Sequence, residues 1–400
     1  MSLTLLFDLD DTLLDTNIEA FIPAYFQSLS EHVASYVSPN VMLPALSSAT
    51  KLMMSSDDPS RTLQCVFEAD FYEKLGVSKQ KLTEAIDYYY DNVFPGIEVK
   101  TKRRPDAAPL IEWALSKGYR LAVATDPLFP RKATLHRLRW AGLDPSQFEI
   151  VSTFEDFHFT KAFPEYYAEV LGQLGWPDGP VLMVGNDAQR DLIPANRLGL
   201  KTYFIDGDPA SSPGFEAGCG KLADLRPWLE STDLSTLEPS FKSPDAILAI
   251  MHSTPAAINS LLSLLTKDEW QTEPAREDWA MNEIICHLRD TEREIHHMQL
   301  KLMLERDGAF IPRPDTGVWA SERDYLHEDG KTALDEFTHA RLANVDLLSK
   351  MDGDMWSRKA RHAIFGPTDF LEVAGFMADH DRMHVQQIWK TLQSLRNGRV

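Results

Sequence analysis

The chain opens with Leu3-Thr4-Leu5-Leu6-Phe7-Asp8-Leu9-Asp10-Asp11-Thr12-Leu13, an apolar run that ends in acidic residues. The apolar residues favour a buried β-strand. Because side chains alternate along a strand, Asp8 and Asp10 point the same way where this strand ends. The pair is typical of a nucleophile beside an acid/base, although an acidic turn after an edge strand explains most isolated D-x-D pairs equally well.

The composition restricts the class of protein and its partners. Among the 400 residues, acidic side chains outnumber basic ones and give a formal net charge of −20. Such a surface repels nucleic acid and anionic membranes, so neither is expected as a partner. The absence of a signal-peptide pattern and of any run of about 18 apolar residues predicts a cytoplasmic protein without a membrane span. The three cysteines, Cys65, Cys219 and Cys286, are widely separated and fit free thiols in a reducing compartment.

Strand-like and helix-like segments alternate after the first hundred residues. Strands are predicted at residues 120–125, 148–152, 181–185 and 201–205. Helices are predicted at residues 106–117, 131–141, 164–174 and 187–198. This alternation predicts an α/β domain with a doubly wound, Rossmann-like parallel sheet that includes the first strand. Residues 15–99 carry apolar residues at three- and four-residue steps and are predicted to form a helical cap inserted after that strand.

Polar residues follow three of the predicted strands. They are Asp8 and Asp10, then Thr125, and then Asn186 with Asp187. In an open α/β sheet, ligands bind beyond the carboxyl ends of the strands, so these side chains are expected to converge. This expected convergence of residues far apart in the sequence is the main indication of a functional site in this half.

The converging residues suit phosphoryl transfer through an aspartyl enzyme. That reaction needs a carboxylate nucleophile, a proton donor, cationic groups around the phosphoryl oxygens and a metal ion. We predict that Asp8 attacks the phosphorus and that Asp10 protonates the leaving oxygen and later activates water. Thr125 is predicted to donate its hydroxyl to a phosphoryl oxygen, and Lys161 is predicted to neutralise charge that would oppose the attack.

Four segments in this order resemble the motifs of the haloacid dehalogenase-like (HAD) superfamily. They are Phe7 to Leu13, Ala124 to Asp126, Lys161, and Val184 to Asp187 together with Asp191. The resemblance covers about residues 1–225 and implies a hydrolase whose helical cap selects the substrate. It also implies that Mg²⁺ is held by Asp8, the backbone carbonyl of Asp10 and an acidic residue of the fourth motif.

The fourth motif supplies the remaining candidate ligands for Mg²⁺. Asp187 and Asp191, four residues apart at the start of a helix, complete an oxygen-rich shell beside Asp8 and Asp10. The first acidic position of the motif falls on Asn186 or on Asp187, depending on how the turn is aligned. The choice between these two residues is left open by the sequence.

The expected reaction is hydrolysis of a small phosphorylated metabolite. Asp10 favours a phosphatase over a dehalogenase, because members of the family that cleave carbon–halogen bonds do not need that acid. Two departures from the family pattern, Asp126 and Ala162, remove no catalytic group. Cap residues such as Arg61 and Tyr88 could read a sugar, a nucleotide or an acid equally well, so the substrate stays open.

The pattern changes after about residue 206. Residues 208–214 and 231–235 are rich in turn formers. Beyond residue 244 four amphipathic segments, without a strand pattern, predict an all-α four-helix bundle. They span residues 244–265, 279–306, 331–351 and 368–395, with a long loop at 307–330. The predicted domains are a hydrolase core at 1–14 and 100–225, a cap at 15–99, a linker at 226–243 and the bundle at 244–400.

Three histidines of the bundle form a candidate metal site. His380 and His384 stand four apart on one helix and present two imidazoles on one face. His287, from another helix, would close a three-nitrogen site with positions open to water or substrate. An H-x-x-x-H pair alone is more often a solvated helix face. His296 and His297 are expected to turn away from His287 and to lie on the surface.

The histidine pattern resembles the DinB family of four-helix metalloproteins. The residues that carry the resemblance are Trp279, His287-Leu288, and the H-x-x-x-H helix that continues into Gln386-Gln387-Ile388. It covers about residues 244–400 and implies Zn²⁺, Ni²⁺ or a similar divalent ion at His287, His380 and His384. The family includes thiol-dependent transferases and isomerases, so one alternative makes the bundle an enzyme with a low-molecular-weight thiol as partner. Another makes it a structural binding module through which the chain forms a homodimer.

Overall fold

The computed structural model describes residues 2–207, 214–263, 265–275 and 278–397. Most of the predicted turn at 208–214 lies outside these residues. Contacts divide the chain into two compact units, Met1–Tyr167 with Asp178–Pro239, and Ala168–Pro177 with Ser240–Val400. The domain boundaries expected from the sequence stay predictions.

A six-stranded parallel sheet organises the first unit. Its order is β5 (Ile150–Val151), β4 (Arg120–Val123), β1 (Thr4–Phe7), β6 (Val181–Gly185), β7 (Lys201–Ile205) and β8 (Gly218–Gly220). All four residues of β1 are buried, as expected for a central strand covered on both faces. The predicted doubly wound α/β fold is confirmed, and β8 is a sixth strand that its sequence, Gly-Cys-Gly, did not indicate.

Helices connect the strands of this sheet, and the last two of this unit follow its final strand. They are α5 (Ala107–Ser116), α6 (Arg131–Trp140), η3 (Pro145–Gln147), α7 (Pro164–Gln173), η4 (Ala188–Leu192), α8 (Ile193–Leu198), α9 (Leu222–Ser231) and η5 (Leu234–Leu237). The π-helical η4 begins directly after the turn that follows β6. The carboxyl ends of β1, β4 and β6 therefore lie side by side at one edge, where loops and helix starts meet.

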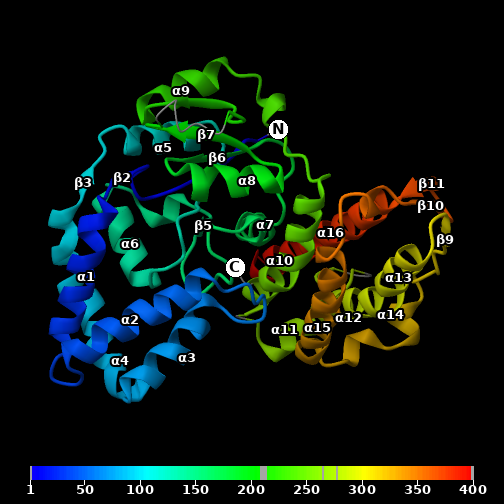
Figure 1. The fold of residues 1–400 in the computed structure, drawn as a ribbon, viewed down its shortest axis with the longest axis horizontal. Helices are drawn as coiled ribbons and strands as arrows, with labels where there is room; N and C mark the ends of the chain where they lie inside the picture. Colours follow the sequence, from blue (N-terminus) through cyan, green and yellow to red (C-terminus); the bar gives the residue numbers. More distant parts are fainter. Residues whose placement is uncertain (1, 208–213, 264, 276–277, 398–400) are drawn as a thin grey trace. The chain divides into compact units, whose positions relative to one another are not determined.

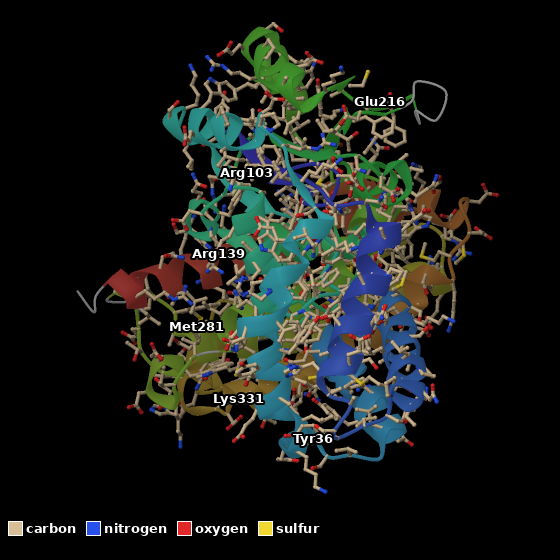
Figure 2. The ribbon with its side chains drawn as sticks, turned by 90° about the vertical axis from the view of Figure 1, so that its left-hand side faces the viewer. Tyr36, Arg103, Arg139, Glu216, Met281 and Lys331 are labelled. Atoms are coloured by element: carbon tan, nitrogen blue, oxygen red, sulfur yellow. The ribbon has the colours of Figure 1, made fainter. Side chains whose placement is uncertain are left out.

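The helical cap predicted at residues 15–99 is formed by four α-helices. These are α1 (Ile18–His32), α2 (Pro39–Met54), α3 (Leu63–Leu75) and α4 (Lys79–Tyr88), followed by η1 (Tyr89–Val93) and η2 (Phe94–Lys100). Two short strands, β2 (Leu14–Asp15) and β3 (Lys102–Arg103), pair antiparallel where the cap leaves and rejoins the core. Figure 2 shows Arg103 near this junction and Tyr36, between α1 and α2, at the opposite end of the cap.

Four long helical segments form the second unit, as predicted. They are α10 (Pro244–Leu262), α12 (Met281–Asp290) continued by η6 (Thr291–His296) and α13 (His297–Glu305), α15 (Gly330–Ser349) and α16 (Phe370–Asn397). Shorter helices are α11 (Lys267–Trp270), α14 (Trp319–Glu322), η7 (Tyr325–His327) and η8 (Met355–Ser357). None of the described helices is long and apolar enough to cross a membrane.

The bundle also carries a small sheet that the sequence analysis missed. Its strands are β9 (Ala309–Ile311), β10 (Lys359–His362) and β11 (Gly366–Asp369), in the order β11-β10-β9. Each strand has only three or four residues, which is too short for an alternating pattern to stand out. The predicted loop at 307–330 is therefore partly structured, with β9, α14 and η7 inside it.

Candidate active site and candidate metal centre

One cavity in the first unit brings together all six residues predicted for the N-terminal site. Its volume is about 470 Å³, and its lining includes Asp8, Asp10, Thr125, Lys161, Asp187 and Asp191. The register of the sheet explains this, because Phe7 pairs with Val123 on one side and with Val184 on the other. Cap residues from α1 and α2 also line it, among them Tyr25, Phe26 and Thr50.

Asp8 lies at the buried end of this cavity, beside a lysine. Lys161 Nζ donates to Asp8 Oδ1 at 2.6 Å and also forms an ion pair with Asp191. The pKa of Asp8 is raised to about 7, because the effect of burial and of the nearby carboxylates of Asp191 and Asp10 exceeds the lowering by the Lys161 ammonium. The lysine therefore opposes the effect of burial and favours the ionised form of Asp8, which is the nucleophilic one.

Asp10 is held by two partners on opposite oxygens. Thr16 Oγ1 donates to Asp10 Oδ1 at 2.7 Å, and Arg137 forms an ion pair with Oδ2. Arg137 is fully buried on α6, and its guanidinium lies 4.3 Å from the centre of the Phe129 ring. Arg137 was not among the site residues predicted from the sequence. An arginine next to Leu138 on the buried face of a helix was the available signal, because an unpaired buried arginine is rare.

The fourth motif forms a tight turn around Asp191. Asp191 Oδ2 accepts hydrogen bonds from the backbone N–H groups of Asn186 and Asp187, both at 2.9 Å. The same carboxylate leaves no room for a Cβ at Gly185. Asp187 caps η4 by accepting from two backbone N–H groups, at 2.8 and 3.2 Å, while the Asn186 amide oxygen accepts from Thr12. Asp191 thus positions the turn, and both alternatives for the first acidic position line the cavity.

Asp126, where the family pattern commonly has asparagine, has its own partners in this structure. Its Oδ2 forms an ion pair with Arg190, and its Oδ1 accepts from the backbone N–H of Lys161 at 3.3 Å. A carboxylate at this position therefore matches an arginine that lines the same cavity. Asp126 connects the loop that carries Lys161 to the start of the fourth-motif helix.

The oxygen ligands around the cavity suit Mg²⁺, a hard cation that prefers carboxylates and backbone carbonyls. The candidates are Asp8, the carbonyl of Asp10, Asp187 and Asp191. In the described part of the chain, however, only a histidine group places three possible ligand atoms within 4.8 Å of one another. Between Asp8 and Asp191 the structure has the Lys161 ammonium, which balances the negative charge there.

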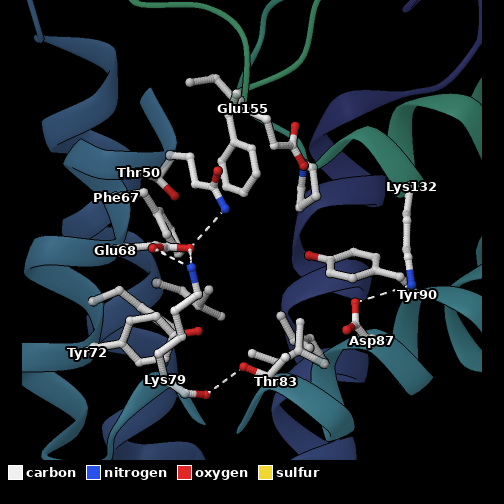
Figure 3. Close-up of a pocket in the computed structure, with 18 of the residues that line it drawn as sticks. Thr50, Phe67, Glu68, Tyr72, Lys79, Thr83, Asp87, Tyr90, Lys132 and Glu155 are labelled. Atoms are coloured by element: carbon white, nitrogen blue, oxygen red, sulfur yellow. Dashed lines mark hydrogen bonds and ion pairs between the residues drawn. The ribbon is translucent and has the colours of Figure 1, made fainter. Parts of the chain in front are cut away.

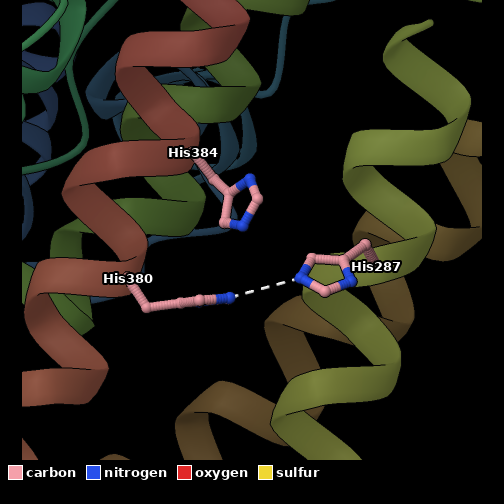
Figure 4. A group of neighbouring side chains, drawn as sticks. All are labelled: His287, His380 and His384. Carbon is pink, nitrogen blue, oxygen red and sulfur yellow. Dashed lines mark hydrogen bonds between the residues drawn. The ribbon is translucent and has the colours of Figure 1, made fainter. Parts of the chain in front are cut away.

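That histidine group is the predicted one, formed by His287 on α12 and by His380 and His384 on α16 (Figure 4). The Nε2 atoms of His287 and His380 are 3.3 Å apart, and the three rings lie with centres 4.4 to 5.4 Å from one another. Trp279 packs against this group, with its ring centre 5.1 Å from that of His287. The structure therefore brings together the three residues that the sequence pattern selected.

The three imidazoles are in the form that binds metal ions. Burial lowers the pKa of His287 to about 3 and the pKa of His380 well below its usual value, and it also lowers the pKa of His384. They are therefore neutral at pH 7, as metal ligation requires. His384 Nδ1 pairs with Gln387 Oε1 at 2.9 Å, which leaves Nε2 free for a ligand. His287 Nδ1 and His380 Nδ1 are buried without a hydrogen-bond partner among the described residues.

The expectation that His296 lies on the surface is wrong. His296 is buried, with its ring centre 5.3 Å from that of His380, and its Nδ1 lies 2.9 Å from Glu292 Oε2. The reason is η6, a π-helical stretch that holds one residue more per turn than an α-helix. The extra residue changes the helical phase by roughly 100° and turns His296 toward the metal centre. His297 is half-buried and pairs with Asn344 at 2.6 Å.

A fully buried ion network supports this part of the bundle. Arg341 on α15 donates to both oxygens of Glu292, at 2.8 and 2.7 Å, and forms an ion pair with Asp381 on α16. Asn344 donates to Glu292 at 2.7 Å. Arg341, Glu292 and Asp381 all have an exposed fraction of 0%. The network therefore ties three helices together beside the histidines.

A cavity in the bundle reaches the candidate metal centre at His380. It has a volume of about 300 Å³, and polar and apolar residues share its lining. They include His296, His362, Arg313, Phe365, Phe376 and Met383. His362 Nδ1 accepts from two backbone N–H groups, at 3.2 and 3.3 Å, so its proton lies on Nε2. The centre is therefore next to a space that a small molecule can occupy.

Comparisons with known proteins assign the two halves separately. Residues 3–199 match the model of the haloacid dehalogenase-like hydrolases, and residues 250–388 match that of the DinB superfamily. The pyrophosphatase PpaX of Bacillus pumilus is 26% identical over 211 residues, which cover 52% of this chain and 86% of PpaX. PpaX of Bacillus cereus is 24% identical over 242 residues, covering 58% and 98% of the two chains.

Two solved structures are similar to separate parts of the chain. A HAD phosphatase from Thermococcus onnurineus is 23% identical, with a TM-score of 0.38. The similar region covers 57% of this chain and 98% of the phosphatase chain. YfiT from Bacillus subtilis, described as a probable metal-dependent hydrolase with an unusual four-helix bundle topology, is 18% identical, with a TM-score of 0.36. The similar region covers 40% of this chain and 91% of the YfiT chain.

Proposed function

Because residues 3–199 are a haloacid dehalogenase-like hydrolase domain and residues 250–388 a DinB-superfamily domain, we propose that the chain is a Mg²⁺-dependent phosphatase fused to a metal-binding bundle. The reaction is hydrolysis of a phosphoric ester, and the substrate is a small phosphorylated metabolite. The observation that carries the proposal is the contact of the buried nucleophile Asp8 with Lys161, in a cavity that also contains Asp10. The proposed location is the cytoplasm.

The proposed reaction has two steps at the same phosphorus atom. An oxygen of Asp8 attacks phosphorus, the bond to the leaving oxygen breaks, and Asp10 gives that oxygen a proton. Water then attacks the aspartyl phosphate, Asp10 takes its proton, and the bond between phosphorus and Asp8 breaks. The contacts of Asp10 with Thr16 and Arg137 fix the direction of its carboxylate.

The remaining residues of the cavity stabilise negative charge. Lys161 neutralises charge near Asp8, and Thr125, which lines the same cavity just after β4, would donate its hydroxyl to a phosphoryl oxygen. Asp8, the Asp10 carbonyl, Asp187 and Asp191 would hold Mg²⁺. When bound, the ion supplies positive charge to the phosphoryl oxygens.

The first test is phosphate release from a panel of phosphomonoesters with and without Mg²⁺. We expect turnover with Mg²⁺, a loss of at least about 100-fold after chelation, and full recovery when Mg²⁺ is added back in excess. Circular dichroism of the chelated protein serves as the control for folding. Turnover that is unchanged after chelation would refute the role of the metal, and no phosphate release from folded protein with Mg²⁺ would refute the phosphatase.

The bundle is proposed to hold a divalent transition metal at His287, His380 and His384. Imidazole nitrogens suit Zn²⁺, Ni²⁺ and related ions, and the ligands alone do not select one. The cavity at His380 favours a reactive centre over a purely structural one, because structural sites are closed. Transfer of a low-molecular-weight thiol and dimerisation through the bundle remain predictions.

His384→Ala is expected to lose the metal of the bundle. We expect about one transition metal per wild-type chain, and an affinity at least about 100-fold weaker in the variant, since loss of an outer-shell partner alone costs 10- to 100-fold. Metal analysis after dialysis against a buffer with defined free metal gives the result. His327→Ala is the matched control, because His327 is an exposed histidine of the same domain. Equal metal content in wild type and His384→Ala would exclude this site.

A further inference from the structure

The cap contains a second cavity that adjoins the candidate active site. It has a volume of about 230 Å³ and is lined mainly by residues of α1 to α4 (Figure 3). Four residues line both cavities, namely Tyr25, Phe26, Thr50 and Leu128. We call the second cavity the cap chamber. These four side chains therefore lie between the space at Asp8 and the cap chamber, so the two cavities are neighbours.

Aromatic side chains dominate the wall of the cap chamber. They are Tyr25, Phe26, Phe67, Phe71, Tyr72, Tyr90 and Phe154. Phe67 stacks on Phe71 with ring centres 4.8 Å apart, and the hydroxyls of Tyr25 and Tyr90 lie 2.6 Å from each other. Figure 3 shows Phe67 and Tyr72 on one side of the open space and Tyr90 on the other. Flat faces on both sides favour a planar guest.

The charged residues of the cap chamber already have partners within the protein. Lys79 donates to both oxygens of Glu68, at 2.7 and 2.8 Å, and Lys132 donates to Asp87 at 3.2 Å. Glu155 accepts from the backbone N–H of Arg131 at 2.9 Å. A charged guest would have to compete with these pairs, whereas a neutral guest leaves them intact.

The two cap residues considered in the sequence analysis do not line this space. Arg61 and Tyr88 are absent from the lining of both cavities, and Tyr88 stacks on His32 with 58% of its surface exposed. The residues that do line the cap chamber, the aromatic ones among them, are therefore better candidates for contact with a substrate.

We propose that the cap chamber binds the leaving group of the substrate and that this group is a neutral aromatic alcohol. The inference rests on the proposed phosphatase function. The volume is sufficient, since an apolar cavity of roughly 150 Å³ holds a benzene ring. After the bond between phosphorus and the ester oxygen breaks, that oxygen takes the proton of Asp10 and leaves as a neutral alcohol. Inorganic pyrophosphate, whose leaving group is an anion, would fit this chamber poorly.

The test compares three substrates on the full chain with Mg²⁺. They are benzyl phosphate, propyl phosphate and inorganic pyrophosphate. The two esters release alcohols of similar acidity, so a difference in kcat/KM between them reports binding of the ring. We expect benzyl phosphate to exceed each of the others by at least about tenfold in kcat/KM, mainly through a lower KM.

Two variants connect this preference to the chamber. Thr83→Trp fills it from an exposed position on α4, and Phe67→Ala removes one aromatic face. Both are expected to reduce the ratio of kcat/KM for benzyl over propyl phosphate to about one third or less. Ser47→Trp, an exposed position on α2 that lines neither cavity, is expected to keep the ratio of the wild type.

The outcomes separate this inference from the proposed function. Phosphate release from propyl phosphate or pyrophosphate at a rate equal to that from benzyl phosphate would overturn the chamber proposal and leave the phosphatase standing. A benzyl preference that Thr83→Trp and Phe67→Ala do not change would also overturn it. No release from any of the three substrates by folded protein would count against the phosphatase itself.

Discussion

Asp8→Asn is expected to reduce Mg²⁺-dependent phosphate release by at least about 10³-fold, because an amide oxygen cannot form the covalent intermediate. The variant has nearly the same volume, and Lys161 keeps its ion pair with Asp191, so we expect the fold to persist. The measurement is kcat on the best substrate of the panel. Incubation with substrate followed by mass spectrometry should show phosphate on the wild-type chain and none on Asp8→Asn.

The matched control for this change is Asp106→Asn. Asp106 precedes α5 in the same domain, is exposed and makes no side-chain capping hydrogen bond. The activity of the Asp106→Asn variant should therefore equal that of the wild type. Thermal unfolding of both variants separates a catalytic effect from a loss of structure. Residual activity above about one tenth of wild type in Asp8→Asn would exclude Asp8 as the nucleophile.

Arg341→Met is expected to destabilise the bundle by about 3–5 kcal/mol, the usual cost of removing one partner from a buried ion pair. Glu292 and Asp381 would both keep a buried charge without their common cation. Burial alone raises the pKa of Glu292, and Arg341 and His296 hold it below its usual range. Chemical denaturation, monitored by hydrogen exchange in α12, α15 and α16, measures the loss of stability in this domain.

Two further variants test the physical explanation. Lys331→Met, an exposed position on the same helix, should stay within about 0.5 kcal/mol of wild type. Replacing Arg341, Glu292 and Asp381 together by apolar residues of similar size should recover most of the lost stability, since buried ion networks are often no better than apolar packing. If Arg341→Met lowers the stability of the bundle by less than about 1 kcal/mol, the expected contribution of the ion network is contradicted.

Much of the candidate site could be predicted because its residues lie in short motifs at strand ends. Asp8, Thr125 and Asp187 each follow a strand with a clear apolar pattern, and parallel pairing brings such ends together. The histidine pair was visible for a similar reason, since four residues on a helix make one turn. In these cases a local rule sufficed to place the residue.

The pairing of Arg137 with Asp10 could not be predicted, because Asp10 lies 127 residues earlier in the chain. No local pattern encodes such a pairing. The aromatic cap chamber was hidden for a related reason: periodicity predicts helices but not which of their faces meet. The strands β8 to β11 were missed because three or four residue pairs per ladder stabilise them without an apolar pattern.

The π-helical stretch η6 has a consequence for chain length. It behaves like a one-residue insertion that the helix absorbs without a loop, so every residue after His296 is displaced by one position in the repeat. Removing any single residue between Thr291 and His296 would leave an unbroken helix and shift the repeat back. The length of that segment therefore decides which side chains face the interior of the bundle, together with the identity of those side chains.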